Sequence, residues 1–404
     1  MRILCIGAGA SGLFFALNCA DEKHEVILVD KNHKVGRKMY ISGKGRCNIT
    51  NNCEVKEFIS NIVNNPKFLY SAISLFKPAD TISFFNEHGC MLKTERGNRV
   101  FPVSDHASDI IDTLFFECKK KKVRIVFEET IREIKKKENQ FVAFGEKGNY
   151  TIDKVVVATG GLSYPVTGST GDGYRFAESF GHTIVEPKPA LCPIKIKEKI
   201  DKQMLKLTLK NVALSANNDH FHQTIFGDLE FLNDAISGPI VLSLSSLINR
   251  EKQVNLSLDL KPALKQETLD KRLLREIEKH PDKDVAYLLS ILLPKEFISF
   301  FLRLSKIDSS LPLSSLPREK RLELLKNLKE LPLTFEGLEQ IEKGIVTSGG
   351  ISVKQINPKT MESKLCEGLY FIGEVLDVDG LTGGFNLQIA LSCGYNCAKA
   401  IKEG

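Results

Sequence analysis

A glycine turn near the start of the chain constrains the fold more than any other feature. Residues 7–12, Gly-Ala-Gly-Ala-Ser-Gly, fit the pattern G-x-G-x-x-G. An apolar strand is expected over 2–7, a helix over 11–20 and a second apolar strand over 25–30, which ends on Asp30. A strand, a glycine turn, a helix and a second strand form a βαβ unit. The chain is therefore predicted to open with an α/β nucleotide-binding domain.

Each part of that pattern has a physical role in binding a dinucleotide. Gly7 permits the tight turn, Gly9 lets a pyrophosphate approach the backbone, and Gly12 allows the helix to pack closely on the strand. The free N–H groups at the helix start then face the anion. The carboxylate of Asp30 accepts a hydrogen bond from a ribose hydroxyl and favours an unphosphorylated ribose. FAD and NAD fit this site better than NADP.

Three later glycine-rich segments favour a flavin. Residues 36–48 form a basic loop whose backbone donors and cations suit the pyrophosphate and ribityl chain. In 158–173, a strand ending in Thr-Gly-Gly places bare backbone beside a planar ligand. In 373–388, an acidic loop leads through a glycine pair into a helix start, which can stabilise negative charge on a flavin edge. Asp377 in that loop is expected to accept from a ribityl hydroxyl.

At these motifs the chain resembles the YhiN/BaiN-like flavoproteins, a bacterial family of NAD(P)/FAD-dependent oxidoreductases. The resemblance implies a glutathione-reductase-like, Rossmann-like FAD-binding domain interrupted by a β-barrel and a small helical insert. The motifs that carry it span the chain: GRKMYISGKGRCNITN (36–51), NRVFPVSDHASD (98–109), ATGGLSYPVTGSTGDGY (158–174), ISGP (236–239), VTSGG (346–350) and GEVLDVDGLTGGFNLQIA (373–390).

The motifs and the resemblance together predict the residues that contact FAD. The resemblance alone suggests that the backbone of Ile131 contacts the adenine. The full predicted set is Gly7, Gly9, Ala10, Ser11, Gly12, Asp30, Lys31, Arg37, Lys38, Ser42, Gly43, Arg46, Cys47, Asn48, Ile131, Ala158, Thr159, Gly160, Gly373, Glu374, Asp377, Gly383, Gly384, Phe385, Asn386 and Leu387.

The hydrophobic patterning divides the chain into three parts. Short alternating runs between 191 and about 260 predict half-buried antiparallel strands, as in a small barrel or sandwich. Helical periods at 269–279, 285–293, 295–304 and 318–329 are separated by prolines. We therefore expect an FAD-binding domain at 1–190 and 345–404, a β-barrel insert at 191–262 and 331–344, and a helical insert at 263–330.

Composition narrows the class of protein. The net charge is only +6, and its one dense basic run, Lys119 to Lys122, suits the end of a helix. None of the ten cysteines has metal-ligand or C-x-x-C spacing, so we expect reduced thiols and no metal site. No apolar stretch reaches the length of a membrane span. The sequence predicts a cytoplasmic protein with a small-molecule substrate and with neither nucleic acid nor membrane as partner.

The favoured function is an FAD-dependent oxidoreductase that transfers hydride through flavin N5 to or from a small organic substrate, with NAD(P)H as the candidate donor. No second G-x-G-x-x-G follows a strand, so no separate nicotinamide domain is expected. The sequence identifies no catalytic residue. It offers six candidates on the substrate side, each with a structural alternative: Arg46, Arg96, Arg99, His106, Tyr164 and Ser348.

Other functions stay open at this point. The fold also suits an FAD-dependent RNA-modifying enzyme, although the weak basicity argues against it. It suits an oxygen-using amine oxidase, because the resemblance covers both enone reduction and amine oxidation. It also suits a flavin-binding interaction protein without turnover. The sequence does not decide between the reductase and oxidase directions.

Overall fold

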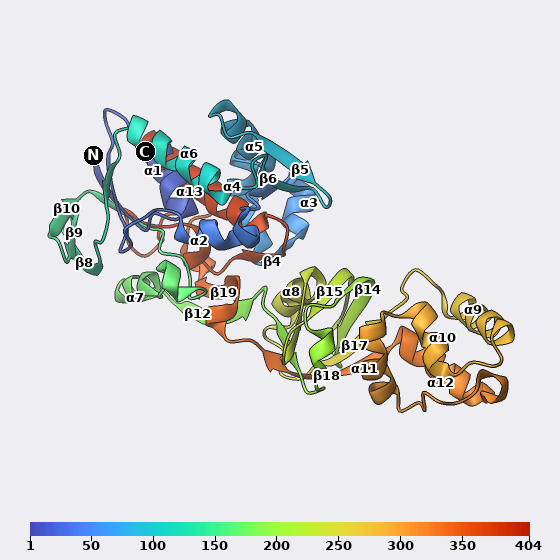
Figure 1. Ribbon diagram of the computed structural model, residues 1–404. Coiled ribbons are helices and arrows are strands. Elements are labelled where there is room, and N and C mark those ends of the chain that lie inside the picture. The colour runs from blue at the N-terminus through green and yellow to red at the C-terminus, as the bar shows by residue number, and fades with distance from the viewer. The chain divides into compact units, whose positions relative to one another are not determined.

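The structure, a computed structural model, describes residues 1–404 and divides them into two units, each with its own hydrophobic core. The first unit combines Met1–Ala190 with Gln340–Gly404, and the second is Leu191–Glu339. Figure 1 labels the elements of both units. The second unit is therefore an insertion in the chain of the first.

A five-stranded parallel sheet forms the centre of the first unit, in the order β20-β11-β1-β2-β7. Because the strands are parallel, the segments that follow their carboxyl ends meet at one edge of the sheet, where ligands bind in open α/β sheets. The glycine turn follows β1, Asp30 follows β2 and the Thr-Gly-Gly segment follows β11. The strands are β1 (Arg2–Ile6), β2 (Glu25–Val29), β7 (Arg124–Val126), β11 (Lys154–Val157) and β20 (Leu369–Phe371).

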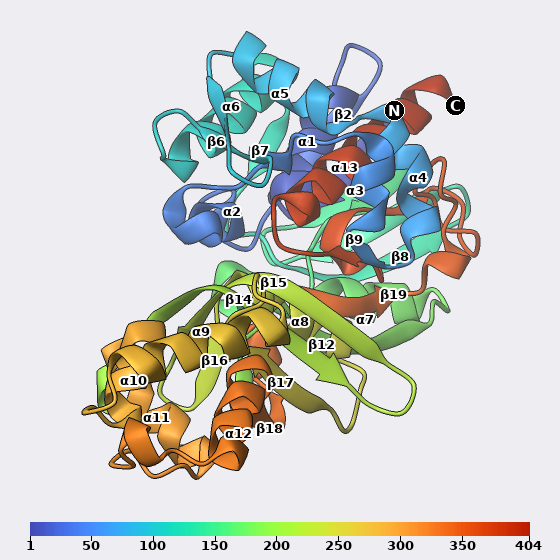
Figure 2. The ribbon, with the colours of Figure 1, turned by 90° about the vertical axis from the view of Figure 1, so that its right-hand side faces the viewer.

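The last helix of the chain packs against the first. In Figures 1 and 2, α13 (Phe385–Glu403) lies beside α1 (Ala10–Cys19). A Cβ on Gly394 would lie 2.6 Å from the carbonyl oxygen of Ser11, so the two backbones approach closely. The other helices of this unit are α2 (Arg37–Ile41), α3 (Val55–Ser60), α4 (Pro66–Leu75), α5 (Pro78–Glu87), α6 (Ala107–Lys120) and α7 (Asp172–Ser179). The basic run predicted at a helix end, Lys119 to Lys122, begins in the last turn of α6 and continues past its end.

Four small antiparallel groups of strands complete the first unit. One is the meander of β8 (Ile131–Lys137), β9 (Gln140–Gly145) and β10 (Asn149–Ile152). The others are β3 (Thr50–Asn51) with β5 (Leu92–Glu95) and β6 (Arg99–Pro102); β4 (Ile62–Asn64) with β21 (Asp379–Gly380); and β12 (Ile184–Ala190) with β19 (Val346–Ile351).

The second unit contains the closed barrel that the alternating pattern predicted. Its strand order is β13-β16-β15-β14-β17-β18. The strands are β13 (Ile194–Ile196), β14 (Thr208–Asn217), β15 (His222–Phe231), β16 (Ala235–Ser237), β17 (Asn255–Asp259) and β18 (Leu331–Leu338). The predicted α/β class and the interrupting barrel are confirmed.

The strand prediction is wrong for part of this region. Pro239–Ile248 form helix α8, and of the alternating run expected as a strand at 205–209 only Thr208 and Leu209 belong to one, β14. Pro239 occupies the first helical turn, where its missing N–H costs nothing. The alternating serines do not face solvent: Ser245 and Ser246 are buried and accept hydrogen bonds from the backbone N–H groups of residues 192 and 191. Burial of these serines made a helix resemble a half-exposed strand.

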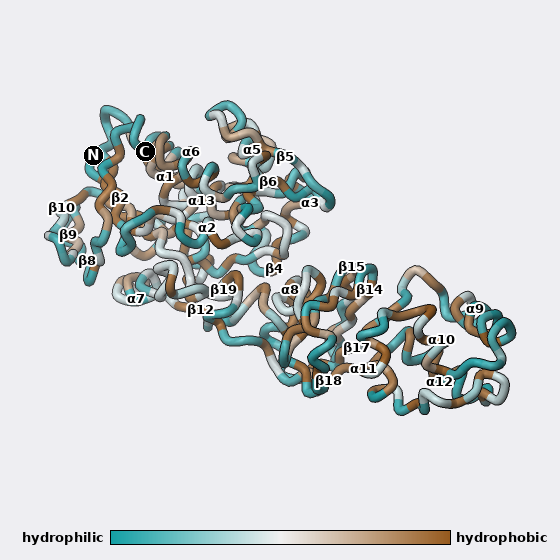
Figure 3. The backbone as a smooth tube through the Cα atoms, viewed as in Figure 1, coloured by the Kyte–Doolittle hydropathy of each residue, from teal (hydrophilic) through white to brown (hydrophobic).

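All four predicted helices of the insert are confirmed. They are α9 (Gln266–Lys279), α10 (Val285–Leu292), α11 (Lys295–Ser305) and α12 (Arg318–Lys329). Figure 3 shows α9 as largely hydrophilic, whereas α10 and α11 carry long apolar stretches. Across the chain, every helix lacks the combination of length and apolar character that a membrane crossing requires.

Candidate functional site

The glycine turn has the geometry that a bound pyrophosphate requires. Gly7 has a φ of +108°, and a Cβ there would lie 2.5 Å from the carbonyl oxygen of Ala158. A Cβ on Gly12 would lie 1.9 Å from the carbonyl oxygen of Gly7. Beside Gly9, in contrast, no atom lies within 4 Å of an added Cβ. Gly7 and Gly12 are thus required by the fold, whereas Gly9 faces open space at the start of α1.

Asp30 joins the end of β2 to this turn. Its Oδ2 accepts a hydrogen bond of 2.7 Å from the backbone N–H of Ala8. Its Oδ1 accepts from the backbone and side-chain nitrogens of Asn32 at 2.8 and 2.9 Å. Two carboxylate oxygens provide about four lone-pair positions, so these three bonds leave one for a ribose hydroxyl.

Two of the predicted cofactor cations have protein partners. Lys31 Nζ pairs with Asp172 and contacts the hydroxyl of Thr170. Burial raises the pKa of Asp172, but the hydrogen bond and charge of Lys31 outweigh it and leave the pKa below its ordinary value. Arg37 donates to the side-chain oxygen of Asn32 at 2.5 Å. Lys31 therefore links the segment after β2 to the start of α7, whereas Arg37 makes its contact within the segment after β2.

The basic loop after β2 is held by its own side chains. Arg46 pairs with Glu95 and Asp105 and lies 4.1 Å over the ring of Phe101. Asn48 Oδ1 accepts from the backbone N–H of residue 100 at 3.2 Å. Gly43 and Lys44 both have left-handed backbone conformations, with φ of +57° and +58°. Arg46 and Asn48, which the sequence assigned to FAD, stabilise the shape of this loop.

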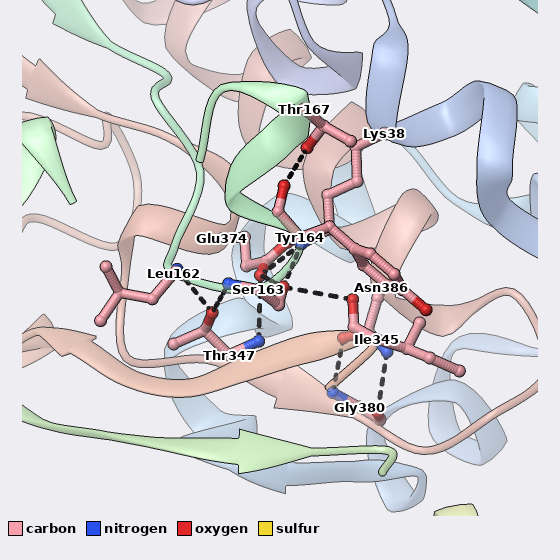
Figure 4. Close-up of polar contacts among 10 residues, drawn as sticks. All are labelled: Lys38, Leu162, Ser163, Tyr164, Thr167, Ile345, Thr347, Glu374, Gly380 and Asn386. Carbon is pink, nitrogen blue, oxygen red and sulfur yellow. Dashed lines mark hydrogen bonds and ion pairs between the residues drawn. The ribbon is translucent and has the colours of Figure 1, made fainter. Parts of the chain in front are cut away.

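A network around Glu374 brings together three of the predicted glycine-rich segments (Figure 4). Lys38 Nζ donates to both carboxylate oxygens of Glu374, at 2.8 and 2.7 Å, and to the hydroxyl of Ser163. Glu374 Oε1 also accepts from the backbone N–H of Thr347 at 3.0 Å. Thr347 Oγ1 in turn accepts from the backbone N–H groups of Leu162 and Ser163 at 2.8 and 3.1 Å.

A second network holds the acidic loop of residues 377–380. Asn65 Nδ2 donates to the carbonyl oxygen and to Oδ2 of Asp377, at 2.7 and 2.9 Å. Asn64 Nδ2 donates to Oδ1 of Asp379 at 2.5 Å and to the hydroxyl of Ser348 at 2.9 Å. Both carboxylates are buried. The amide donors offset the cost of burying these two carboxylates.

The start of α13 is fixed by close backbone contacts. Asn386 brackets Gly380: it accepts from the Gly380 N–H at 2.9 Å and donates to its carbonyl oxygen at 2.8 Å (Figure 4). A Cβ on Gly384 would lie 2.3 Å from the carbonyl oxygen of Thr50. The first turns of α1 and α13 contain no acidic side chain. The positive ends of both helix dipoles are therefore available to an anionic ligand.

Two buried hydroxyls in the segment after β11 have no hydrogen-bond partner. They belong to Thr159 and Tyr174. Burial, with the charges of Glu374 and Asp377, raises the pKa of Tyr174, so its hydroxyl keeps its proton and can donate. The open space at Gly9, the remaining lone pair on Asp30, the two helix starts and these hydroxyls are all consistent with a polar dinucleotide. The residues present fit FAD.

The other predicted site residues lie around these networks. Ser42 donates to the carbonyl oxygen of Met39, Cys47 is fully buried and Ile131 begins β8. Among the substrate-side candidates, Arg99 donates to the carbonyl oxygen of Arg96. His106 precedes α6 without capping it through its side chain. The roles of the predicted contact residues stay predictions.

Five residues of the networks were not predicted: Asn64, Asn65, Ser163, Thr347 and Asp379, the last of which lies inside motif 373–390. Ser163 and Thr347 lie inside motifs 158–174 and 346–350. The motifs therefore pointed to these segments, although no argument singled out these two residues. Asn64 and Asn65 precede Pro66 in a segment without glycine-rich character. Their sequence reads as an ordinary helix start, and their partners lie more than 280 positions further along the chain.

Comparisons with known proteins agree with this geometry. Residues 1–400 match the family model described as the HI0933-like protein Rossmann domain. The chain is 30% identical over 410 residues to a 3-dehydro-bile acid delta(4,6)-reductase of Clostridium scindens, covering 100% of this chain and 99% of the relative. It is 32% identical over 398 residues to a ribosomal RNA dihydrouridine synthase of Escherichia coli, covering 98% and 96%.

A solved structure supports the fold. The 3-ketosteroid-delta4-(5alpha)-dehydrogenase of Rhodococcus jostii RHA1 superposes with a TM-score of 0.52 at 12% identity, covering 98% of this chain and 96% of that one. The family match confirms the resemblance seen in the motifs, and with it the cofactor, FAD. The chain belongs to the HI0933-like Rossmann family and is an FAD-dependent oxidoreductase.

Proposed function

We propose that the protein reduces a carbon–carbon double bond conjugated to a carbonyl group. The observation that carries the proposal is the similarity, over nearly the whole chain, to two relatives whose names describe such a reaction. A delta(4,6)-reductase of a 3-dehydro compound acts on double bonds in conjugation with a ketone. A dihydrouridine synthase saturates the ring double bond that lies next to a uracil carbonyl. The two substrates differ in size and charge but share this bond.

The shared bond defines the reaction. When bound, FAD supplies hydride chemistry. The substrate takes up hydride at the carbon remote from the carbonyl and a proton at the carbon next to it. We assign NADH or NADPH as the source of the two electrons, since FAD can pass hydride to the substrate only after an external two-electron donor has reduced it.

This chain's residues would bind the cofactor and hold its surroundings. Gly9 and the start of α1 would accept the pyrophosphate, and Asp30 the ribose. The Lys38–Glu374 pair would fix the loop after β2 against the segment after β20. The network of Asn64 and Asn65 would hold the acidic loop before α13 in one position. The hydrogen bonds and the open space described above support these assignments.

An anaerobic half-reaction tests the proposal. The purified protein with FAD is first bleached near about 450 nm with NADPH or NADH. A steroid dienone or a uridine-containing ribosomal RNA transcript is then added without oxygen. Return of the absorbance, with a saturated product, supports the proposal. An isolated alkene serves as the control, because it lacks the carbonyl that accepts charge.

Other outcomes would overturn the proposal. If neither conjugated substrate reoxidises the flavin, while amines bleach the oxidised protein and oxygen restores it, the protein is an amine oxidase of the same fold. If the isolated alkene reoxidises the flavin as fast as the dienone, conjugation to a carbonyl is not what the site recognises.

A further inference from the structure

The stretch of chain made up of the helical insert and the two residues before it carries most of the surplus positive charge. Residues 261–330 contain 15 Lys or Arg against 11 Asp or Glu, a surplus of four, whereas the whole chain has a surplus of six. A low net charge for a whole chain therefore conceals a basic segment. Clustered charge, rather than total charge, marks a surface that binds polyanions.

Three of these cations line one cavity. A cavity of about 340 Å³ is lined by Leu264, Thr268, Lys271, Arg272 and Arg275. Apart from the adjacent Lys271 and Arg272, these residues recur every three or four positions, so they lie along one face of α9 and the turn before it. From Thr268 to Arg275 that face is about two helical turns long, or about 10 Å. Three cations and a hydroxyl thus project from one side of a single helix.

The cations of this cavity have few counter-ions. Lys271 and Arg272 make no ion pair or hydrogen bond through their side chains, and Arg275 approaches only Glu276, at 3.5 Å. Two nearby carboxylates are engaged elsewhere: Asp270 binds Arg321 at 2.7 Å, and Asp259 binds Lys329 at 2.6 Å.

Lys261, half-buried and also without an ion pair, adds a further positive charge near Arg272. Burial, followed by the charge of Arg272, lowers the pKa of Lys261. Like charges that lack counter-ions repel each other, and a bound anion would relieve this repulsion. Together with the cavity, this charge arrangement indicates a site for an anion.

We propose that this cavity binds phosphate groups of an RNA chain and that it is a docking site for an RNA substrate. A row of cations along a helix face matches the repeated charges of a polynucleotide, whereas one small anion would engage only part of the row. Thr268 adds a hydroxyl, a donor that often contacts phosphate oxygens. The inference rests on the proposed function, because uridine in RNA is one of the two substrates considered there.

Binding of a fluorescein-labelled RNA hairpin with a uridine-rich loop tests the site without any turnover. The variant carries Lys271→Glu, Arg272→Glu and Arg275→Glu in the full-length, FAD-loaded protein. The control carries Lys295→Glu, Arg318→Glu and Lys326→Glu, which change the charge equally. These control residues are exposed, make no ion pair and do not line the cavity.

We expect the cavity variant to bind the hairpin on the order of tenfold to a hundredfold more weakly than the wild type. Its plot of log affinity against log salt should be shallower by about two to three, because three phosphate contacts are lost. The control should stay close to the wild type. The flavin absorbance and melting temperature of both variants are compared with the wild type, so that a folding defect is recognised.

Two outcomes would contradict the proposed RNA site. If both variants lost affinity for the hairpin equally, binding would depend only on the net charge of the protein. If the cavity variant bound the hairpin as tightly as the wild type, RNA would bind at another surface. Failure of the proposed function is seen separately: in that case no conjugated substrate reoxidises the flavin, whether or not RNA binds.

Discussion

Lys38 Nζ lies 2.7 Å from a carboxylate oxygen of Glu374, although the two residues come from opposite ends of the chain. Both side chains are about three-quarters buried. The pair fastens the basic loop after β2 to the segment after β20. This ion pair thus holds together two segments at the edge of the sheet where the predicted cofactor-binding segments lie.

Replacing Lys38 should destabilise the first unit. In Lys38→Met, Glu374 loses its charged partner and keeps only the Thr347 N–H and the Ser163 hydroxyl. We expect the free energy of unfolding of the apoprotein to fall by about 1–3 kcal/mol, as measured by urea denaturation. Adding Glu374→Gln should restore part of this loss, because the unpaired charge disappears.

The control for this pair is Lys34→Met, at an exposed lysine without a partner. It should leave the unfolding free energy within about 0.5 kcal/mol of the wild type. An equal loss in Lys34→Met and Lys38→Met would show that the ion pair does not contribute.

Two glycines of the same turn should respond differently to alanine. Gly9 has open space beside it, so Gly9→Ala should change the unfolding free energy of the apoprotein by less than about 1 kcal/mol. The new methyl group would stand where the pyrophosphate approaches, and FAD affinity should fall on the order of tenfold or more. Quenching of flavin fluorescence measures the affinity.

The Gly12→Ala variant, in contrast, should fail to fold. Its Cβ would overlap the carbonyl oxygen of Gly7, so the backbone must shift, at a cost above about 3 kcal/mol. If Gly9→Ala destabilised the apoprotein as strongly as Gly12→Ala, the open space at Gly9 would have no functional meaning.

The ten cysteines should differ sharply in reactivity. All ten are free, and only Cys53 and Cys366 are part-exposed. Burial raises the pKa of Cys53 to about 11, and the pKa of Cys47 to about 12. At pH 8 a thiol-specific dye should therefore label at most two groups slowly in the folded protein and all ten after unfolding in urea. Fast labelling of a third thiol in the folded protein would contradict the burial.

The same thiols make stability fall in alkali. A pKa that is higher in the folded than in the unfolded state means that the folded state holds the proton more tightly. The stabilisation that such a thiol gives to the folded state is complete below the pKa of about 9 in the unfolded state. It is lost as the pH rises towards 12. Urea denaturation between these limits should show a steady loss of stability.

His182 should make the fold sensitive to mild acid. Ser363 Oγ accepts from the backbone N–H groups of Leu365 and Cys366, so its own proton donates to Nε2 of His182 at 2.8 Å. Burial lowers the pKa of His182. The unfolded state therefore binds the proton more readily, and stability should fall as the pH drops below about 6.5, by at most about 1.4 kcal/mol per pH unit.

A pair of variants isolates this effect. His182→Leu should flatten the pH dependence between about 5 and 6.5, whereas the exposed His33→Gln should leave it unchanged. Urea denaturation across this range is the measurement. An unchanged slope in His182→Leu would mean that other groups cause the acid sensitivity.

Local patterns predicted the parts of the fold that local forces determine. The turn at Gly7 to Gly12, the strand before it and the four helices of the insert follow from glycine geometry, hydrophobic period and proline breaks. Helix α8 was missed because its buried serines imitate an alternating strand. Burial of a polar side chain depends on what packs against it, which sequence spacing does not reveal.

The sequence predicted a site residue correctly only where the local motif itself gives the physical reason for that residue. Asp30 could be identified by its distance from the glycine turn, but its bond to Ala8 could not. Arg46 looked like a cofactor cation, yet Glu95 and Asp105 approach it from distant segments. Asn64 and Asn65 hold two carboxylates that follow them by more than 300 positions. Such partners are set by tertiary structure.

The insertion of Leu191–Glu339 into the first unit has a consequence for synthesis on the ribosome. Strand β20 and helix α13, which complete the first unit, are translated after the whole barrel and its helices. The inserted unit is thus able to fold before the first unit has all of its elements. Binding of FAD should then follow synthesis of α13, and a nascent chain that stalls before α13 would carry a folded barrel beside an incomplete FAD-binding unit.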